Sequence, residues 1–233
     1  MQYVELHQVS QQKASKKHSM SRPIEQLNLA AGKRSIIGIR AKETKARTAL
    51  IHILSGVSIP ASGSYFIDAL PLPYQSDKQM AAFRNSNIGS VSYSFPLIPK
   101  WNVIENVSFP LNYSSRCGQS RLEAIALKAL KFVKLHDTAK RELWTLTSGE
   151  ELRIKIARAI VNMPKVVIAE ISLEELNKSQ ADPVIDIISN LPALDITTIL
   201  LTEDPELEKI CSRQYELLEN TLVETKGMKH YPV

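Results

Sequence analysis

The sequence predicts an α/β protein built on a parallel β-sheet. Two apolar runs, Val166–Ala169 and Thr197–Leu201, are typical of strands buried on both faces of a sheet. An amphipathic helix over Glu150–Met163, stopped by Pro164, precedes the first of these runs. Helices that alternate with buried strands indicate parallel strands joined by crossover connections.

Length and composition fit one domain. The 233 residues are 44% hydrophobic and 23% charged, which is ordinary for a globular protein. A net charge of +5 does not by itself indicate nucleic acid, because an anionic membrane surface or a docking partner would suit it equally. Cys117 and Cys211 have no metal-like spacing, so we expect a reduced, cytosolic chain. The strand-like N-terminus is no signal peptide, and no apolar run approaches the ~18 residues of a membrane span.

The N-terminal part predicts mainly strands. Tyr3–Val9 alternates polar and apolar residues, as a half-buried strand does, and Ile24–Leu29 is the second expected strand. Between them, Lys13–Arg22 is basic and is interpreted as a solvated connection, with a phosphate-seeking arm as the alternative. Because no aromatic residues interleave these charges, we expect no nucleic-acid partner. A turn at Ala31–Lys33 leads into an apolar strand that ends near Ile39.

Elements of both kinds follow. The helix after this third strand should end at Ser55–Gly56, because glycine is a common helix stop. Pro60–Gly63 predicts a turn, and a strand is expected over Ser64–Ile67. Lys78–Phe83 predicts a helix, and Asn87–Ser92 predicts a further short strand.

Helical patterns dominate from Trp101 to about Arg141. Ser120–Val133 carries apolar residues at helical spacing with polar residues between them. Because this helical stretch interrupts the α/β pattern, we expect an inserted helical subdomain over approximately residues 94–145.

Positions 41–48 follow a strand and lead into a helix, which is the layout of a phosphate-binding loop with the pattern G-x-x-x-x-G-K-[ST]. The pattern positions hold Ala41, Ala46, Arg47 and Thr48, and only Thr48 fits. Alanine in a glycine conformation with positive φ would cost about 1 kcal/mol or more. Arg47 keeps the positive charge of the lysine but is a wide planar fork. The Thr48 hydroxyl is a candidate Mg²⁺ ligand or, alternatively, the cap of the following helix.

Several segments together resemble the nucleotide-binding subunit of ATP-binding-cassette (ABC) transporters, and in particular the stand-alone ATPase of lipoprotein-release and macrolide-export systems. Residues 60–63 resemble the P-x-S-G turn of that family. Residues 83–91 and 94–111 resemble the segment through its glutamine loop and transporter-facing groove. Residues 146–170 resemble the run from the signature motif to the Walker B strand, and 197–213 the switch-histidine strand with the helix after it.

The resemblance implies a fold and its organisation. The expected fold is P-loop NTPase-like (RecA-like), with a parallel sheet core, an N-terminal antiparallel β subdomain and an inserted helical subdomain. Residues 1–233 would form one nucleotide-binding domain, in which residues 1–93 and 146–233 make the core and β subdomain and residues 94–145 the helical subdomain.

The resemblance also identifies positions at which this sequence departs from the family. Lys13 stands where an aromatic residue stacks on adenine, although an exposed loop lysine is the favoured interpretation. Tyr93 replaces the glutamine that touches Mg²⁺ and the attacking water; alternatively, it is an anchor packed between subdomains. Ile171 replaces the catalytic glutamate and cannot polarise water. Asn177 replaces the aspartate of the D-loop, and Glu203 replaces the switch histidine and would repel phosphate.

Two further sites are altered but not lost. Glu170 ends the Walker B run in place of aspartate, and its side chain is one methylene too long for the octahedral geometry that Mg²⁺ demands. Thr48 and Glu170 are therefore the possible metal ligands. The signature motif LSGGQ is replaced by a run that either contacts phosphate at a helix N-terminus or is a plain helix cap. This run consists of Leu146, Thr147, Ser148, Gly149 and Glu150.

These departures predict a degenerate ABC subunit that does not itself hydrolyse ATP. The expected partners are a membrane-spanning transporter subunit, docked near Tyr93–Glu105, and a second nucleotide-binding subunit, as a homodimer or heterodimer. ATP and Mg²⁺ would bind, if at all, at a composite site to which this chain supplies its signature motif, and the chain would lie in the cytoplasm at the membrane. A divergent but active ATPase and a nucleotide-free structural or regulatory subunit are the alternatives.

Overall fold

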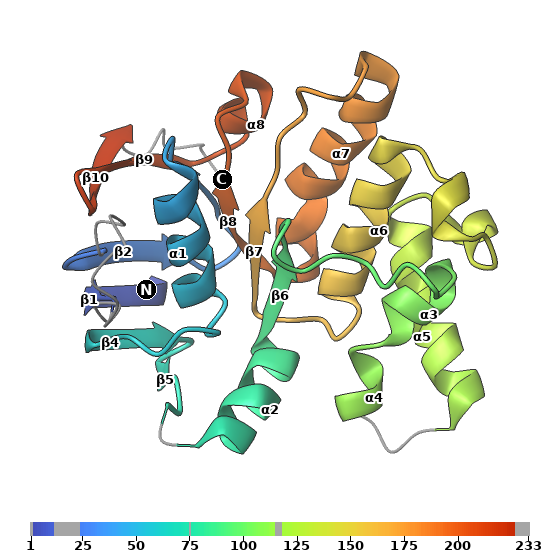
Figure 1. Ribbon diagram of the computed structural model, residues 1–233, viewed down its shortest axis with the longest axis horizontal. Coiled ribbons are helices and arrows are strands. Elements are labelled where there is room, and N and C mark those ends of the chain that lie inside the picture. Colours follow the sequence, from blue (N-terminus) through green and yellow to red (C-terminus); the bar gives the residue numbers. More distant parts are fainter. Residues whose placement is uncertain (1, 12–23, 75, 115–117, 227–233) are drawn as a thin grey trace.

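In the computed structural model, which describes residues 2–11, 24–74, 76–114 and 118–226, the chain forms two β-sheets (Figure 1). The six-stranded sheet has the order β10-β9-β3-β8-β7-β6, and only the β9–β10 pair is antiparallel. Its strands are β3 (Ile36–Arg40), β6 (Ile88–Val91), β7 (Val166–Glu170), β8 (Thr197–Leu201), β9 (Arg213–Leu218) and β10 (Thr221–Lys226).

The second sheet has four strands in the order β2-β1-β4-β5, and all its pairings are antiparallel. It consists of β1 (Gln2–Ser10), β2 (Leu27–Gly32), β4 (Ser62–Ile67) and β5 (Leu70–Pro71). Helix α1 (Thr44–Leu54) buries four apolar side chains in the core that this sheet shares with the six-stranded sheet.

Successive side chains of the central strands point to opposite faces of the six-stranded sheet and contribute to two hydrophobic cores, one on each face. In β3, Ile37 and Ile39 belong to the core shared with α1, whereas Ile36 belongs to the opposite core. In β7, Val166 and Ile168 lie in the first core and the intervening Val167 in the second. This separation follows from the two-residue period of a strand, and it explains why both faces must be covered.

The second core is covered by helices that lie on the right in Figure 1. The main ones are α6 (Ser148–Ile160), α7 (Lys178–Asn190), α3 (Val103–Ser108) and α5 (Gln119–Phe132). The other helical elements are α2 (Asp77–Asn87), α4 (Leu111–Ser114), α8 (Pro205–Lys209) and the 3₁₀ turns His136–Thr138, Leu143–Thr145 and Leu191–Leu194.

The segment that enters the helical part is fixed by one buried amide. Asn106 is fully buried, and its Oδ1 accepts from the N–H of Ile98 at 2.7 Å. Its Nδ2 donates to the carbonyls of Ile98, Trp101 and Asn102 at 3.0–3.2 Å. Arg158 of α6 also donates to the carbonyl of Pro96 at 2.8 Å, and burial lowers the pKa of its guanidinium. Side chains therefore hold residues 96–102 in one conformation.

The predicted fold class is confirmed: a parallel core, an antiparallel N-terminal sheet and a helical insertion are all present. One strand was misplaced. The strand predicted over Ile24–Leu29 is β2, which runs to Gly32, and the turn falls later, at Arg34 with φ of 58°.

The antiparallel β9–β10 hairpin at the C-terminal end was not predicted. Its signal was present in the alternating pattern on both sides of Glu219 and Asn220, whose φ angles of 45° and 86° form the turn.

Within the described residues, no helix is both long enough and apolar enough to span a membrane. The basic run Lys13–Arg22, with Lys13 itself, lies outside the described residues.

Candidate functional site

The phosphate-loop pattern falls largely on a helix. Strand β3 ends at Arg40 and helix α1 begins at Thr44, so three residues join them. Thr44 to Thr48 are helical, and the N–H of Arg47 donates to the carbonyl of Glu43 at 2.9 Å, as in an α-helix. Five of the eight pattern positions therefore lie in the helix, and only the three before Thr44 form a connecting loop.

The strain expected at the two replaced glycines is absent, and that prediction is wrong. Neither Ala41 nor Ala46 has a positive φ. Ala41 is instead 2% exposed and packed at the end of β3, and Ala46 lies in the first turns of α1. Alanine fits both conformations without cost.

Arg47 is held between two carboxylates. Its Nε lies 3.1 Å from Oε1 of Glu170, at the end of β7, in an ion pair whose N–H is not aligned with the oxygen. Its Nη1 lies 3.3 Å from Oε1 of Glu203, just after β8, and 3.2 Å from the carbonyl of Ala41. The cation that would attract phosphate is therefore already compensated by two negative charges.

The two possible metal ligands do not fit Mg²⁺. Thr48 lies inside α1, where its hydroxyl donates to the carbonyl of Thr44 at 2.9 Å, so its predicted role as the helix cap is wrong as well. Glu170 is engaged by Arg47 on one oxygen and lies 3.4 Å from the N–H of Tyr93 on the other. Among the described residues, no group of three or more His, Cys, Asp or Glu side chains is arranged to hold a metal ion.

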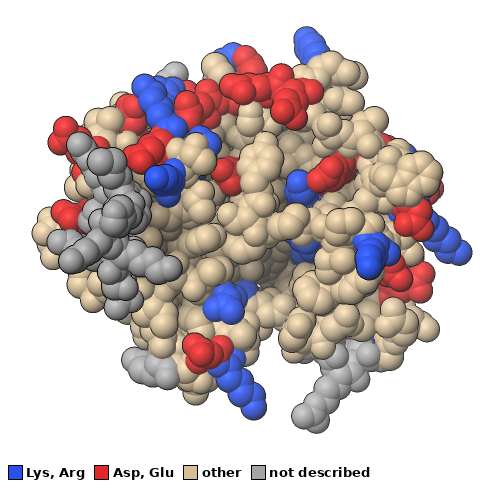
Figure 2. Space-filling model, in the orientation of Figure 1, with Lys and Arg blue, Asp and Glu red and all other residues tan. Residues whose placement is uncertain are grey.

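The site opens into a cavity of about 590 Å³ at the carboxyl ends of the central strands. Two of its lining side chains are cations, Arg47 and Lys155, and Lys155 is paired with Glu151 at 2.8 Å. Figure 2 shows acidic side chains gathered along the upper edge of the molecule, above the loop between β7 and α7 and above α8. The six acidic lining residues are Glu151, Glu170, Glu174, Glu175, Glu203 and Asp204. Carboxylates therefore outnumber cations in the lining by six to two.

The positions aligned with water-handling residues differ in exposure. Tyr93 is 72% exposed in the cavity, with Lys155 Nζ 5.9 Å from its ring centroid, so its predicted role as a packed anchor is wrong. Ile171 is 3% exposed and belongs to the second core. Asn177 caps α7 by accepting from the N–H of Gln180 at 3.1 Å and does not line the cavity.

The run Leu146–Glu150 forms a helix cap. Thr147 is the N-cap of α6, and its hydroxyl accepts from the N–H of Glu150 at 3.2 Å. Glu150 in turn accepts from the N–H of Thr147 at 2.9 Å and pairs with Arg141 at 3.0 Å. Burial raises the pKa of Glu150, but the Thr147 N–H and Arg141 outweigh burial and bring the pKa below its usual value. Ser148, by contrast, is exposed and lines the cavity.

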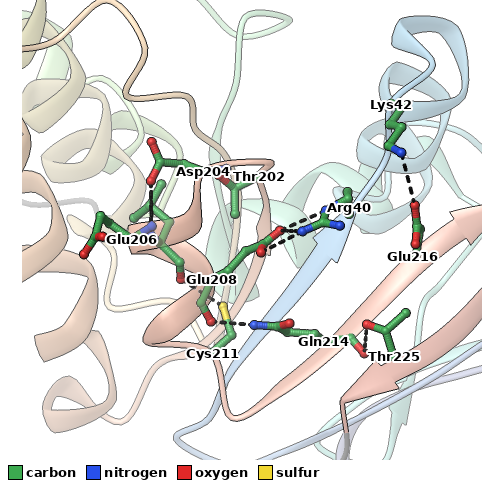
Figure 3. Close-up of polar contacts among 11 residues, drawn as sticks. Arg40, Lys42, Thr202, Asp204, Glu206, Glu208, Cys211, Gln214, Glu216 and Thr225 are labelled. Atoms are coloured by element: carbon green, nitrogen blue, oxygen red, sulfur yellow. Dashed lines mark hydrogen bonds and ion pairs between the residues drawn. The ribbon is translucent and has the colours of Figure 1, made fainter.

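The segment around Glu203, which joins β8 to α8, is held by contacts to β3 and within α8, several of which are drawn in Figure 3. Arg40, at the end of β3, donates to both carboxylate oxygens of Glu208 in α8, at 2.6 and 2.8 Å. Asp204 caps the same helix by accepting from the N–H of Glu206 at 2.9 Å. The N–H of Thr202 donates to the carbonyl of Ile39 at 3.1 Å. The backbone around Glu203 is therefore tied to β3 on both sides.

The structure brings together Ala41, Tyr93, Ser148, Glu170, Ile171, Glu203 and Arg47 around one cavity. Ala46, Thr48, Asn177, Leu146, Thr147, Gly149 and Glu150 do not line it. Sequence reasoning missed the lining residues Glu151, Lys155, Glu174 and Glu175. Helical periodicity could have identified the first two, because Ser148, Glu151 and Lys155 recur on one face of α6.

The comparisons with known proteins agree with this architecture. Residues 24–170 match the model of the family described as ABC transporter. YknY of Bacillus subtilis (strain 168), an uncharacterized ABC transporter ATP-binding protein, is 30% identical over 187 residues, which cover 80% of this chain and 81% of YknY. YvrO of the same strain, described in the same words, is 27% identical over 200 residues, covering 86% of this chain and 87% of YvrO.

Solved structures share the fold. The ATP-binding cassette MJ0796, solved as a dimer in a post-hydrolysis state with ADP and Pi, has a TM-score of 0.85 at 22% identity, covering 98% of this chain and all of MJ0796. CbiO1 of Clostridium perfringens, part of the CbiONQ transporter complex, has a TM-score of 0.78 at 19% identity, covering 96% of this chain and 88% of CbiO1. With the match over residues 24–170, the parallel core and its helical insertion, this chain belongs to the ABC transporter family of ATP-binding proteins.

Proposed function

We propose that this chain is a degenerate ABC transporter subunit that does not hydrolyse ATP at its own Walker site. The observation that carries the proposal is Ile171, which is 3% exposed and packed in the core at the place where a carboxylate would position the attacking water. An apolar side chain cannot accept a proton or orient water, and that orientation is much of what a protein contributes to phosphoryl transfer. The pairing of Arg47 with Glu170 and Glu203 supports the same conclusion.

The chain would work as one half of a pair. A second nucleotide-binding subunit would bring its own Walker motifs to the exposed Ser148 at the start of α6, where free helix N–H groups favour an anion. The segment near Tyr93–Glu105, held by Asn106 and Arg158, would dock on a membrane-spanning subunit at the cytoplasmic side. The lipoprotein-release and macrolide-export type of transporter is the proposed context.

The test is an asymmetric mutation pair in the assembled transporter. Ser148→Glu adds a carboxylate in the first turn of α6, which suits the helix dipole but repels phosphate. We expect this variant to lower the ATPase rate of the complex at least tenfold. Arg47→Gln, on the idle side, should leave the rate within about twofold, because no turnover passes through Arg47.

Three results would decide between the alternatives. Equal loss in both variants, or ATP hydrolysis by the purified chain that Arg47→Gln removes, would establish a divergent active ATPase. Full activity in both would favour a nucleotide-free structural or regulatory subunit. Unchanged unfolding midpoints of both variants serve as the control for folding.

A further inference from the structure

Arg47 retains unused capacity for an anion. A guanidinium has five N–H donors, and Arg47 uses Nε toward Glu170 and Nη1 toward Glu203 and the Ala41 carbonyl. Among the hydrogen bonds between described residues, none uses Nη2. The side chain lines the cavity and is 27% exposed, so an anion in the cavity can reach it.

The two carboxylates that compensate Arg47 are not equivalent. The Glu170 side chain is 11% exposed and also lies near the N–H of Tyr93. Separating it from Arg47 would therefore leave a largely buried carboxylate without its cation, which is costly. The Glu203 side chain is 44% exposed and meets Arg47 through a single 3.3 Å contact. Glu203 is therefore the carboxylate that can move to solvent.

Movement of Glu203 requires no backbone change. The residues on either side are fixed, since Thr202 is bonded to β3 and α8 is tied to Arg40 through Glu208 (Figure 3). A rotation about the side-chain bonds of Glu203 is then sufficient to uncover Arg47.

We propose that Glu203 is a built-in counter-ion that keeps an anion site at Arg47 closed, and that its charge is what excludes the phosphate groups of a polyphosphate. The proposal rests on the proposed function, because it treats this cavity as the degenerate Walker site. With Glu203 ionised, Arg47 faces two negative charges, and an incoming phosphate meets a net repulsion. Without that charge, Arg47 and Glu170 form a neutral pair, and Nη1 and Nη2 are available to phosphate oxygens.

The experiment measures binding of inorganic tripolyphosphate and of Mg-ATP to the purified full chain by calorimetry. Glu203→Gln keeps the shape of the side chain and removes its charge. We expect the dissociation constant for tripolyphosphate to fall at least tenfold relative to the unchanged protein. We expect the dissociation constant for Mg-ATP to fall by a similar factor. No hydrolysis should follow, because Ile171 still occupies the position of the catalytic carboxylate.

Two control variants isolate the contact. Glu174→Gln removes the same charge from the same cavity, but Glu174 makes no ion pair among the described residues. It should leave binding within about twofold. Glu203→Gln combined with Arg47→Gln should abolish the gain. Circular dichroism of each variant is the control for folding, which Glu203→Gln should leave unchanged because the Glu203 side chain is 44% exposed.

Each outcome is decisive. No gain in Glu203→Gln, or an equal gain in Glu174→Gln, overturns the proposal, since exclusion would then come from the missing loop or from the general acidity of the cavity. A gain for Mg-ATP with none for tripolyphosphate also overturns it, because the ligand would not be recognised by its phosphates. The proposed function fails separately, on the evidence of ATP turnover by the unchanged chain.

Discussion

At the scale of single residues, the close contact between α6 and α7 explains why position 149 holds a glycine. A Cβ added to Gly149 would lie 2.8 Å from Cβ and 3.3 Å from Cγ of Gln180 in α7. Gly149 is buried and does not line the cavity. The glycine that survives in the signature run is thus explained by the contact between α6 and α7, whether or not a phosphate ever approaches it.

Gly149→Ala should therefore destabilise the isolated chain. Forcing a methyl group into this contact costs about 1–3 kcal/mol of unfolding free energy, because α6 and α7 must separate. Urea unfolding measures the loss. Gly32→Ala, at the end of β2, is the control, since an added Cβ there meets nothing within 4 Å and its φ is not positive, so stability should change by less than about 0.5 kcal/mol. Equal effects of the two substitutions would contradict the packing explanation.

Asn106 is the second residue with a decisive local role. Asn106→Leu would remove four hydrogen bonds from a fully buried position. Among the described residues it would leave the N–H of Ile98 and the carbonyl of Trp101 without partners, whereas the carbonyls of Ile98 and Asn102 keep a backbone bond. We expect a loss of about 2 kcal/mol or more in chemical unfolding. Faster amide hydrogen exchange over residues 98–102 should accompany it. The exposed Asn112, changed to Ala, should have neither effect.

Two elements of the site are set by their ends. Helix α1 starts at Thr44, inside the phosphate-loop pattern, and its N-cap residue Glu43 offers no side-chain hydrogen bond. Helix α6 starts with a complete capping box between Thr147 and Glu150. Helix α1 therefore includes five of the eight pattern positions, whereas α6 has a capped N-terminus at which Ser148 lines the cavity.

The capping box predicts a pH dependence. The pKa of Glu150 is lowered in the folded protein, so its carboxylate stabilises the fold above its ordinary pKa of 4.5, and that contribution is lost as the pH falls through the lower folded value. Glu150→Gln keeps an oxygen that can accept from the N–H of Thr147 but removes the charge that pairs with Arg141. The free energy of unfolding near pH 7 should fall by about 0.3–1 kcal/mol, and its further decrease at acidic pH should become smaller. Thermal unfolding at pH 3–7 measures both effects. If the pH dependence of unfolding between pH 3 and 7 were the same in both proteins, the Glu150 carboxylate would not have this stabilising role.

At the scale of the whole molecule, the hydrophobic cores are continuous, and the charge of Arg47 in the cavity is balanced by carboxylates of the same chain. Both faces of the six-stranded sheet are covered by continuous cores, and side chains fix the segment that leads into the helices. The cavity at the strand ends carries an excess of carboxylates. Fold stability should thus be independent of any nucleotide.

Millimolar Mg-ATP should accordingly shift the unfolding temperature of the unchanged chain by less than about 1 °C. A ligand present at 100 times its dissociation constant would stabilise by about 2.7 kcal/mol and produce a shift of several degrees. Differential scanning fluorimetry with an intact ABC subunit as positive control makes the comparison. A shift of several degrees would show that nucleotide binds despite the Arg47 contacts.

Much of the fold could be predicted from the sequence because the spacing of apolar residues and the glycine and proline stops are local properties of the chain. The buried runs that became β7 and β8, the helix that became α6 and the glycine stop after α1 were all identified from short stretches. The β9–β10 hairpin was missed because its turn is made by Glu219 and Asn220 without glycine. The domain boundaries near residues 93 and 145 remain a prediction.

The sequence by itself determined the fold class and the family to which the chain belongs, and its order predicts that Arg47, Ile171 and Glu203 occupy motif positions of that family. Only the tertiary structure decided what those residues do to one another. Glu170 ends β7 and Glu203 lies just after β8, and their carboxylates meet Arg47 because these two strands end at the same edge of the sheet. Charge compensation of this kind depends on distances of a few ångströms between segments far apart in sequence, and no local pattern encodes it.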